Sequence, residues 1–287
     1  MYELHRVGEH TYYIACPAKI GVYDAGDGVY LVDSGNDKDA GRRVKKILDE
    51  RGWRLKAILN THSHADHIGG NKYLQSQTGC AVFSPGIEAD FTRHPLLEPS
   101  FLYGGCPPAE LRHKSLMAQE SDAAGTLPAE IELIPLPGHS FDMVGYRTPD
   151  DVVFLSDCLS SAATLEKYGI PFLYDVCAAL ETLERVAEMK ARLFVPAHAD
   201  TAEDVSLLAR LNGEKLRAAA DMIADICHTP IAFEEILKSV FDRYGLAMTF
   251  EQYVLVGSTV RSFLSWMKGE GRLSVAFVEN RMLWAAN

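Results

Sequence analysis

The sequence lacks any long apolar run and any close pairing of cysteines. No segment approaches about 18 uncharged apolar residues, so a transmembrane helix is not indicated. Six cysteines are scattered along the chain without a C-x-x-C pair, and the first residues lack the apolar core of a signal peptide. We therefore expect a cytoplasmic protein without a membrane partner.

The chain also lacks an excess of basic residues. Lysine and arginine total 28 against 39 aspartate and glutamate residues, which gives a formal net charge of −11. This balance disfavours nucleic acid as a partner unless charge is locally segregated, and it leaves a small molecule as the expected substrate. With 287 residues, of which 47% are hydrophobic, the chain can form one large domain or a main domain with an appendage.

What the sequence does contain is a dense cluster of imidazoles and carboxylates within residues 60–70. Three histidines and one aspartate occupy positions 62 to 67, directly behind a short apolar run. In an extended segment, side chains two residues apart point the same way, so His62 and His64 can hold one cation together. A helix that begins just after them would turn Asp66 and His67 toward a second cation. Imidazole and carboxylate suit zinc, and also iron or manganese, better than calcium or magnesium.

Three later apolar segments each end in a residue that can bind a metal. The segments and the residues that follow them are 131–136 and His139, 151–155 and Asp157, and 193–195 and His198. Each segment is short and nearly continuous in its apolar character, which is typical of a buried strand. Four strands that end along one edge of a layered α/β sheet would bring all seven groups together.

These motifs resemble those of the metallo-β-lactamase superfamily, whose signature H-x-H-x-D-H is met at residues 62–67. Ordered motifs continue from residues 31–35 to the last of these histidines, so the resemblance covers roughly the first two thirds of the chain. It implies two divalent metal ions, zinc in the first place, with iron or manganese as alternatives. The implied ligands are His62, His64 and His139 for one ion, and Asp66, His67 and His198 for the other, with Asp157 bridging the two.

The resemblance further implies an α/β fold, namely a four-layer αβ/βα sandwich, for a catalytic domain over residues 1–203. Residues 204–287 are predicted to form a helical subdomain that ends in a small β-hairpin, somewhat like the winged-helix appendage of lactamase-beta-2-like family members. From Ile231 onward, six basic residues stand against six acidic ones, so no basic patch is present. We therefore favour packing, closing of the pocket or homodimerisation over DNA binding for this part.

Periodicity predicts the individual elements. Strands are expected over residues 11–16, 20–23, 29–32 and 79–83, helices over residues 37–51, 66–77, 175–191, 203–226, 231–244 and 253–267, and a hairpin over residues 273–284. Residues 84–130 form a proline-rich, irregular insertion. Such an insertion either lies over the site and shapes the pocket, or is a surface excursion with a packed underside. His94 and His113 within it are expected outside the metal site.

Four further residues have roles that the sequence leaves open. Asp33 either orients a metal ligand, as the resemblance implies, or is a plain turn residue. Cys158 is expected to be a small buried thiol rather than a ligand or nucleophile. Tyr168 and Tyr174 are candidates, by position only, to polarise the substrate or hold the leaving group, although a buried tyrosine more commonly makes a structural hydrogen bond.

Two cations held close together can share a bridging hydroxide, since metal coordination brings the pKa of bound water from about 15.7 toward about 7. Such a hydroxide would attack a carbonyl or phosphoryl centre, with Asp66 orienting it and Asp157 joining the two ions. We therefore predict a dinuclear metal-dependent hydrolase that acts on a small ester, thioester or lactone, in the manner of glyoxalase II.

Two alternatives use the same kind of site. One is a phosphodiesterase or nuclease, because the same pattern of seven ligands serves those reactions in the family. The other is an iron-dependent oxidoreductase that resembles persulfide dioxygenase, although a complete set of seven ligands argues against it. A true β-lactamase is less expected, because one subclass needs a cysteine at the position of Asp157 and the others lack a bridging aspartate there.

Overall fold

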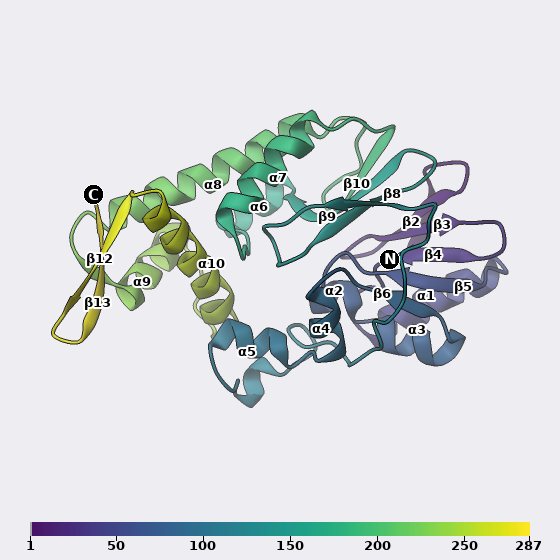
Figure 1. Cartoon of the computed structure of the whole chain (residues 1–287), viewed down its shortest axis with the longest axis horizontal. Coiled ribbons are helices and arrows are strands. Elements are labelled where there is room, and N and C mark those ends of the chain that lie inside the picture. The colour runs from purple at the N-terminus through teal and green to yellow at the C-terminus, as the bar shows by residue number, and fades with distance from the viewer. Residues whose placement is uncertain (1) are drawn as a thin grey trace.

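Two β-sheets packed face to face form the centre of the protein (Figure 1). The computed structural model describes residues 2–287. One sheet has six strands in the order β1-β2-β3-β4-β5-β6, and the other has four in the order β10-β9-β8-β7. The strands are β1 (Glu3–Arg6), β2 (Thr11–Ala15), β3 (Ile20–Asp24), β4 (Val29–Val32), β5 (Leu55–Leu59), β6 (Ala81–Phe83), β7 (Glu132–Pro135), β8 (Val144–Arg147), β9 (Val152–Ser160) and β10 (Leu193–His198).

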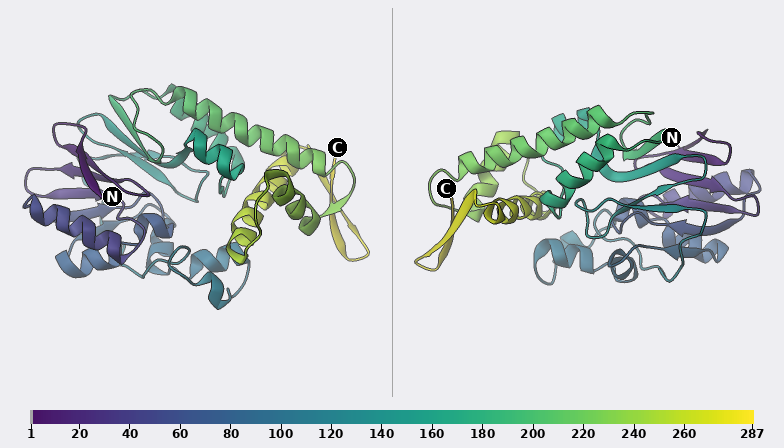
Figure 2. Two further views of the ribbon diagram at one scale, coloured as in Figure 1. Left: turned by 180° about the vertical axis from the view of Figure 1, so that it is seen from behind. Right: turned by 45° about the horizontal axis from the view of Figure 1, so that its top comes forward.

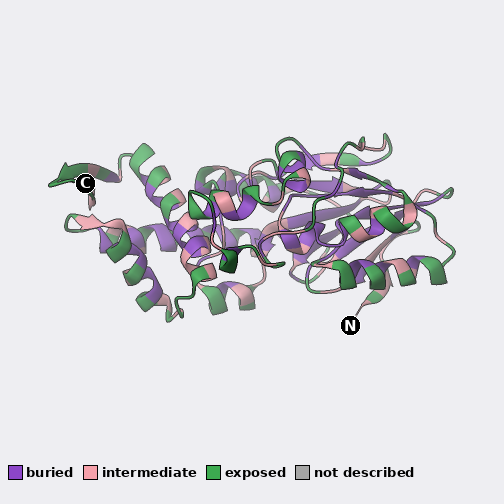
Figure 3. Cartoon of the chain, turned by 90° about the horizontal axis from the view of Figure 1, so that it is seen from below, coloured by how far each residue is buried: buried purple, intermediate pink, exposed green. Residues whose placement is uncertain are grey.

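Helices cover the outer face of each sheet. α1 (Lys38–Glu50) and α3 (Asn71–Thr78) pack on the six-stranded sheet, while α7 (Val176–Glu188) and α8 (Ser206–Ile226) pack on the four-stranded sheet (Figure 1). Figure 3 shows the strands of these two sheets as mostly buried, whereas the helices alternate buried and exposed faces. The result is the four-layer αβ/βα sandwich that the resemblance implied.

Parallel pairing brings the ends of several strands to one edge. β4, β5 and β6 run parallel to one another, and so do β9 and β10. The predicted metal-binding motifs follow β5 and β7, lie in the last part of β9 and end β10. Ligands in such sheets gather at the carboxyl ends of the strands. The first four strands form an antiparallel meander, in which β2, β3 and β4 match the strands expected over residues 11–16, 20–23 and 29–32, whereas β1 was not predicted.

The helix predicted over residues 66–77 is wrong in one respect, because two glycines interrupt it. α2 (Ala65–Ile68) ends at Gly69, and α3 begins after Gly70. A Cβ added to Gly69 would lie 2.3 Å from the backbone carbon of Asn36, and one added to Gly70 would lie 2.3 Å from the backbone oxygen of Ser34. The loop therefore needs glycine at both positions to pack against the chain that leaves β4.

The insertion over residues 84–130 contains short helices rather than only irregular chain. These are α4 (Glu88–Arg93), α5 (Leu97–Tyr103) and the 3-10 helix η1 (Ala109–Leu111). Both α5 and η1 contact α10 (Phe250–Gly269) from the C-terminal part of the chain (Figure 2). The insertion and the C-terminal helices therefore meet beside the sandwich.

The C-terminal part has one strand more than predicted. It consists of β11 (Ile231–Ala232), α9 (Phe233–Tyr244), α10, β12 (Leu273–Val278) and β13 (Arg281–Ala286). β13 pairs with both β12 and β11, so the predicted hairpin becomes a small three-stranded sheet. Counted from α8, the order is helix, strand, helix, helix and hairpin, which is compatible with the winged-helix likeness seen in the sequence.

One hydrophobic core joins the four-stranded sheet to the C-terminal helices. Along α8, Ala209 and Leu216 belong to the same buried cluster as Phe194 of β10 and Phe263 of α10. Because α8 contributes to both parts, the division of the chain at residue 203 stays a prediction. Within residues 2–287, no helix combines the length and the apolar character needed to cross a membrane.

Candidate metal centre

The seven predicted ligands all lie together at the edge where β5, β9 and β10 end. Their side chains form two groups, and within each group the ligand atoms lie within 4.8 Å of one another. The first group is His62, His64 and His139, and the second is Asp66, His67, Asp157 and His198. The structure thus brings the seven residues together in two groups, with Asp157 in the second, and their roles as metal ligands stay a prediction.

In the first group, three imidazole nitrogens converge on one point. Nδ1 of His64 lies 3.0 Å from Nε2 of His62 and 3.0 Å from Nε2 of His139. A single proton on this nitrogen can serve only one of the two contacts. Burial lowers the pKa of His62 well below its usual range and the pKa values of His64 and His139 to about 4. All three rings are therefore neutral near pH 7, which is the form that binds metals.

The second group holds two carboxylates next to two histidines. Oδ1 of Asp157 lies 3.1 Å from Nε2 of His67, and its Oδ2 lies 3.4 Å from Nε2 of His198. Burial opposes the ionisation of both carboxyl groups. The charge of the nearby His67 nevertheless keeps the pKa of Asp157 well below its usual range and helps to lower the pKa of Asp66 to about 2. In turn, Asp157 is the main cause that raises the pKa of His198 to about 10. The ionised carboxylates of the second group therefore favour the binding of a positive charge next to them.

Asp157 also reaches the first group, since its Oδ2 lies 3.5 Å from Nε2 of His139. Its carboxylate faces histidines of both groups, as a bridging ligand must.

Two buried atoms at the centre of the cluster face each other as an ion pair at 3.1 Å but make no hydrogen bond of good geometry with any of residues 2–287. They are Nε2 of His67 and Oδ1 of Asp157. Buried polar atoms without partners are rare in folded proteins, since each one costs the free energy of its desolvation. A cation that both atoms coordinate would satisfy them. The donor set and these two atoms thus fit a divalent metal, and zinc is a metal that such nitrogen and carboxylate donors bind.

Hydrogen bonds at the far side of the rings aim the histidines at the cluster. Nδ1–H of His139 donates to the backbone oxygen of Phe172 at 3.1 Å, and Nδ1–H of His198 donates to that of Pro17 at 3.0 Å. Each ring therefore presents Nε2 to the other ligands. Such partners fix the tautomer and the orientation of metal-binding histidines.

Asp33 performs this task for His67. Its Oδ2 accepts a hydrogen bond from Nδ1–H of His67 at 2.8 Å and another from the hydroxyl of Thr61 at 2.8 Å, while its Oδ1 accepts from the Thr61 backbone N–H. The backbone of Asp33 has a φ of 65°, a region that aspartate and asparagine tolerate better than most residues. Of the two roles that the sequence left open, the structure therefore favours the orienting one.

Glu88 is a residue that the sequence did not single out. Its buried side chain accepts hydrogen bonds from the backbone N–H and the hydroxyl of Ser63, at 2.9 and 2.6 Å, and from the hydroxyl of Ser140 and the backbone N–H of Asp142, at 2.7 and 3.0 Å. Ser63 separates the first two histidine ligands, and Ser140 follows His139. Glu88 thus ties together the two loops that carry the first group.

The insertion also supplies part of a polar pocket over the cluster. This pocket has a volume of about 380 Å³ and includes Asp66, Glu98 and Lys114 in its wall. Glu98 is buried, and its Oε1 lies 3.6 Å from Nε2 of His64. Burial, and then the charge of Glu88, raises the pKa of Glu98 to about 8. The insertion therefore lies over the site and shapes a pocket, which was one of the two roles considered from the sequence.

The remaining residues of interest lie around the cluster rather than in it. His94 and His113 belong to neither group of ligands. Tyr168 lines a second, apolar pocket that reaches His139. Tyr174 packs against Phe141, with the two rings tilted and their centroids 4.0 Å apart.

Cys158 is half-buried and lines the same apolar pocket as Tyr168. Burial, aided by the charge of Asp157, raises the pKa of its thiol far above the usual range. The protonated thiol belongs to the apolar wall and to neither ligand group, although it is half-buried rather than buried as the sequence predicted.

Comparison with known proteins places the chain in a family. A sequence profile of the metallo-beta-lactamase superfamily matches residues 13–198, which is more than half of the chain and contains all seven ligands. The chain belongs to the metallo-beta-lactamase superfamily.

Among relatives in the superfamily, hydroxyacylglutathione hydrolase of Methylococcus capsulatus is 35% identical over 117 residues, which cover 40% of this chain and 38% of the relative. The enzyme of the same name from Nitrobacter hamburgensis is 30% identical over 188 residues, 63% of this chain and 64% of the relative. The chain therefore matches less than two thirds of the length of these relatives.

A solved structure extends the likeness to the C-terminal helices. A metallo-beta-lactamase family protein from Thermus thermophilus superposes with a TM-score of 0.74 at 17% identity, covering 97% of this chain and 99% of the other. At this identity the match establishes the fold alone. It shows that the sandwich and the C-terminal helices of this superfamily member occur together in another protein.

Proposed function

We propose that this superfamily member is a hydrolase that uses two divalent metal ions, zinc in the first place, to cleave a small thioester. Esters and lactones are the related substrates that the same site could take. The observation that carries the proposal is the pair of adjoining ligand groups, the second of which contains the buried atoms His67 Nε2 and Asp157 Oδ1 that make no hydrogen bond. The relatives named hydroxyacylglutathione hydrolase support a thioester as the substrate.

In this proposal each ligand has a defined place. His62, His64 and His139 hold one ion, Asp66, His67 and His198 hold the other, and Asp157 contacts both. When bound, such ions lower the pKa of coordinated water toward about 7 and polarise the oxygen of a carbonyl group.

The protein contributes orientation and charge. The side chain of Asp66 is 42% exposed and lines the polar pocket, so its carboxylate can accept a hydrogen bond from an incoming water and orient it toward the acyl carbon. Hydrolysis then adds the water oxygen to that carbon, breaks the carbon–sulfur bond and leaves one proton on the thiol. A thiol has a pKa of about 8.5, so the thiolate can depart without a strong acid beside it.

The polar pocket offers little basic charge to hold a phosphodiester beside the metal ligands. Among residues 2–287, Lys114 is the one lysine or arginine in its wall, and it is paired with Asp37 at 2.7 Å. The negative charge of a phosphodiester would therefore have only the metal ions as partners, whereas a neutral thioester needs no basic side chain.

The test combines metal analysis of the purified protein with hydrolysis of thioester, lactone and phosphodiester reporters. We expect about two zinc ions per chain and hydrolysis of thioester reporters. Asp157→Ala should lower kcat/KM at least on the order of 100-fold and reduce the metal content, because loss of a partner of a metal ligand alone costs about 10- to 100-fold. Glu214→Ala, at an exposed position of α8, is the matched control and should change neither quantity.

Other outcomes would contradict the proposal. A single iron per chain without hydrolysis would instead favour the oxygen-dependent oxidoreductase. Hydrolysis confined to phosphodiester reporters would favour the phosphodiesterase. The expected homodimer and cytoplasmic location stay predictions, which sedimentation and cell fractionation can test.

A further inference from the structure

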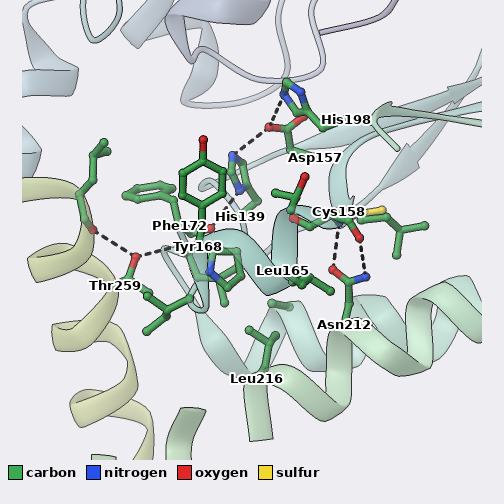
Figure 4. A pocket seen from close by; sticks show the side chains of 18 of the residues that line it. His139, Asp157, Cys158, Leu165, Tyr168, Phe172, His198, Asn212, Leu216 and Thr259 are labelled. Atoms are coloured by element: carbon green, nitrogen blue, oxygen red, sulfur yellow. Dashed lines mark hydrogen bonds and ion pairs between the residues drawn. The ribbon is translucent and has the colours of Figure 1, made fainter. Parts of the chain in front are cut away.

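A second pocket, next to the polar one, is mostly apolar. We call it the apolar cavity; its volume is about 230 Å³. His139, Asp157 and His198 lie at one end of it, and the rest of the wall includes Leu165 of α6 (Ala162–Tyr168) and Leu216 of α8 (Figure 4). Side chains of α10 close another side. The cavity thus begins at the metal ligands and extends between the helices of the C-terminal part.

Two buried polar side chains of this wall, Asn212 and Thr259, already have partners within the protein. Oδ1 of Asn212 accepts from the backbone N–H of Ser160 at 3.0 Å, and its Nδ2 donates to the Ser160 backbone oxygen at 2.9 Å. The hydroxyl of Thr259 accepts from the Leu173 backbone N–H at 3.2 Å and donates to the Leu255 backbone oxygen at 3.2 Å. A polar ligand group placed beside them would lose its hydrogen bonds to water without replacement. The wall therefore suits a hydrocarbon.

The size of the apolar cavity sets the length of that hydrocarbon. An apolar protein cavity of about 150 Å³ takes benzene, which has six carbons. By the same proportion, about 230 Å³ takes a chain on the order of eight to ten carbons.

The two pockets meet at the metal ligands. Both include His139 and Asp157 in their walls, and Phe172 and Leu255 also belong to both. A substrate whose scissile carbonyl lies at the ligands can therefore place one side in each pocket. The apolar side suits the acyl chain, and the polar side suits the thiol.

We propose that the substrate is a thioester of a medium-chain fatty acid, with the acyl chain bound in the apolar cavity. The inference rests on the proposed hydrolase function and adds to it the class of acyl group. Hydrolysis adds water across the carbon–sulfur bond and releases a fatty acid of about eight to ten carbons and a thiol. The C-terminal helices, which lie outside the matched residues 13–198, supply part of the cavity and so set the preference for chain length.

The test uses S-acyl-N-acetylcysteamine thioesters with straight acyl chains from acetyl to dodecanoyl. Each methylene that enters the apolar cavity should raise kcat/KM up to about fourfold, and the rise should level off near eight to ten carbons. Binding of the S-alkyl-N-acetylcysteamine thioethers, which cannot be hydrolysed, is measured in parallel by calorimetry. Their affinity should follow the same dependence on chain length.

A substitution within the apolar cavity tests whether that cavity is responsible. Leu216→Phe should shorten the preferred chain and reduce the preference for decanoyl over butanoyl about tenfold, the contribution of roughly two methylenes. Leu207→Phe lies on the same helix at a position that is 79% exposed, and it should leave the preference unchanged. Because Leu216 is buried, circular dichroism and the thermal midpoint are used to check that the Leu216→Phe protein is folded. Thr164→Phe, at a half-buried position in the wall, provides a second variant.

The outcomes separate the inference from the proposed function. Thioester hydrolysis and thioether binding that do not depend on chain length would overturn the inference and leave the hydrolase standing. Chain-length-dependent thioether binding without hydrolysis of any thioester would overturn the hydrolase and support the cavity as a site for an alkyl chain. An equal loss for all chain lengths in folded Leu216→Phe and Thr164→Phe would also overturn the inference.

Discussion

Replacement of Glu88 should weaken both the fold and the three-histidine group, although Glu88 belongs to neither ligand group. Its side chain is fully buried and accepts four hydrogen bonds, two from backbone N–H groups and two from hydroxyls. Oε2 serves Ser63, and Oε1 serves Ser140 and Asp142. The contacts therefore join the loop of His62 and His64 to the loop of His139.

The magnitude follows from the number of donors left without an acceptor. In Glu88→Gln, the amide oxygen keeps one pair of donors, while the amide nitrogen faces the other pair, which includes a backbone N–H. Hydroxyls can turn to accept, but the backbone N–H cannot, so we expect a loss of about 2–3 kcal/mol in the free energy of unfolding. Glu88→Ala leaves all four donors unsatisfied and should cost at least about 4 kcal/mol.

The assays are urea unfolding and zinc competition with a chromophoric chelator. Because Glu88 positions both loops, the affinity of the three-histidine group for zinc should fall about 10- to 100-fold in Glu88→Gln, the range seen when partners of metal ligands are lost. Glu110→Gln, at an exposed position of the same insertion, is the control and should stay within about 0.5 kcal/mol of the parent protein. A Glu88→Gln protein with unchanged stability and unchanged zinc affinity would refute the reasoning.

Three further predictions test the orienting carboxylate, the glycine loop and the metal site. Asp33→Asn keeps a residue that tolerates the φ of 65° but can place its amide N–H against the Nδ1–H of His67. The zinc affinity of the group that contains His67 should therefore fall about 10- to 100-fold in competition titrations. An unchanged affinity would count against the orienting role. Gly69→Ala would place Cβ 2.3 Å from the backbone of Asn36 and should lower the free energy of unfolding by about 1–3 kcal/mol or more. The control is Gly269→Ala, whose added Cβ has no atom within 4 Å. In the same urea titrations it should be neutral or stabilise the protein by up to about 1 kcal/mol. Free zinc at about 1,000 times its Kd should stabilise the folded protein by about 4 kcal/mol. Chelation of the metal should therefore lower the thermal midpoint of unfolding. A midpoint that does not respond to chelation would contradict a resident metal.

The positions of the ligands could be predicted from the sequence because they depend on local order along the chain. Each ligand follows a short apolar segment, and parallel strands that end together carry such residues to one edge. The imidazoles at 62, 64 and 67 are also close in sequence, so their proximity needs little information about the fold. Their roles as ligands stay a prediction until the metal is measured.

Glu88 could not be found in this way because its importance arises only from tertiary contact. It lies 25 residues from Ser63 and 52 residues from Ser140 along the chain. The surrounding segment, with its prolines and glycines, shows no periodicity that marks a buried carboxylate. Only the folded chain shows that the insertion returns to the metal-binding loops.

The break between α2 and α3 and the strand β11 were missed for different physical reasons. Gly69 and Gly70 are compatible with a helix, and only the close approach of the chain after β4 shows why they are needed. β11 has two residues, too few for a periodic pattern, and its pairing with β13 spans more than fifty residues. The apolar cavity has the same character, because its wall combines separate segments between Pro137 and Thr259.

The most direct test of the central claim is anomalous diffraction at the zinc edge from crystals of the zinc-loaded protein. The proposal predicts two peaks, one bound by His62, His64 and His139 and the other by Asp66, His67 and His198, with Asp157 in contact with both. A single peak, or zinc bound away from these seven residues, would contradict the dinuclear site and the hydrolase that depends on it.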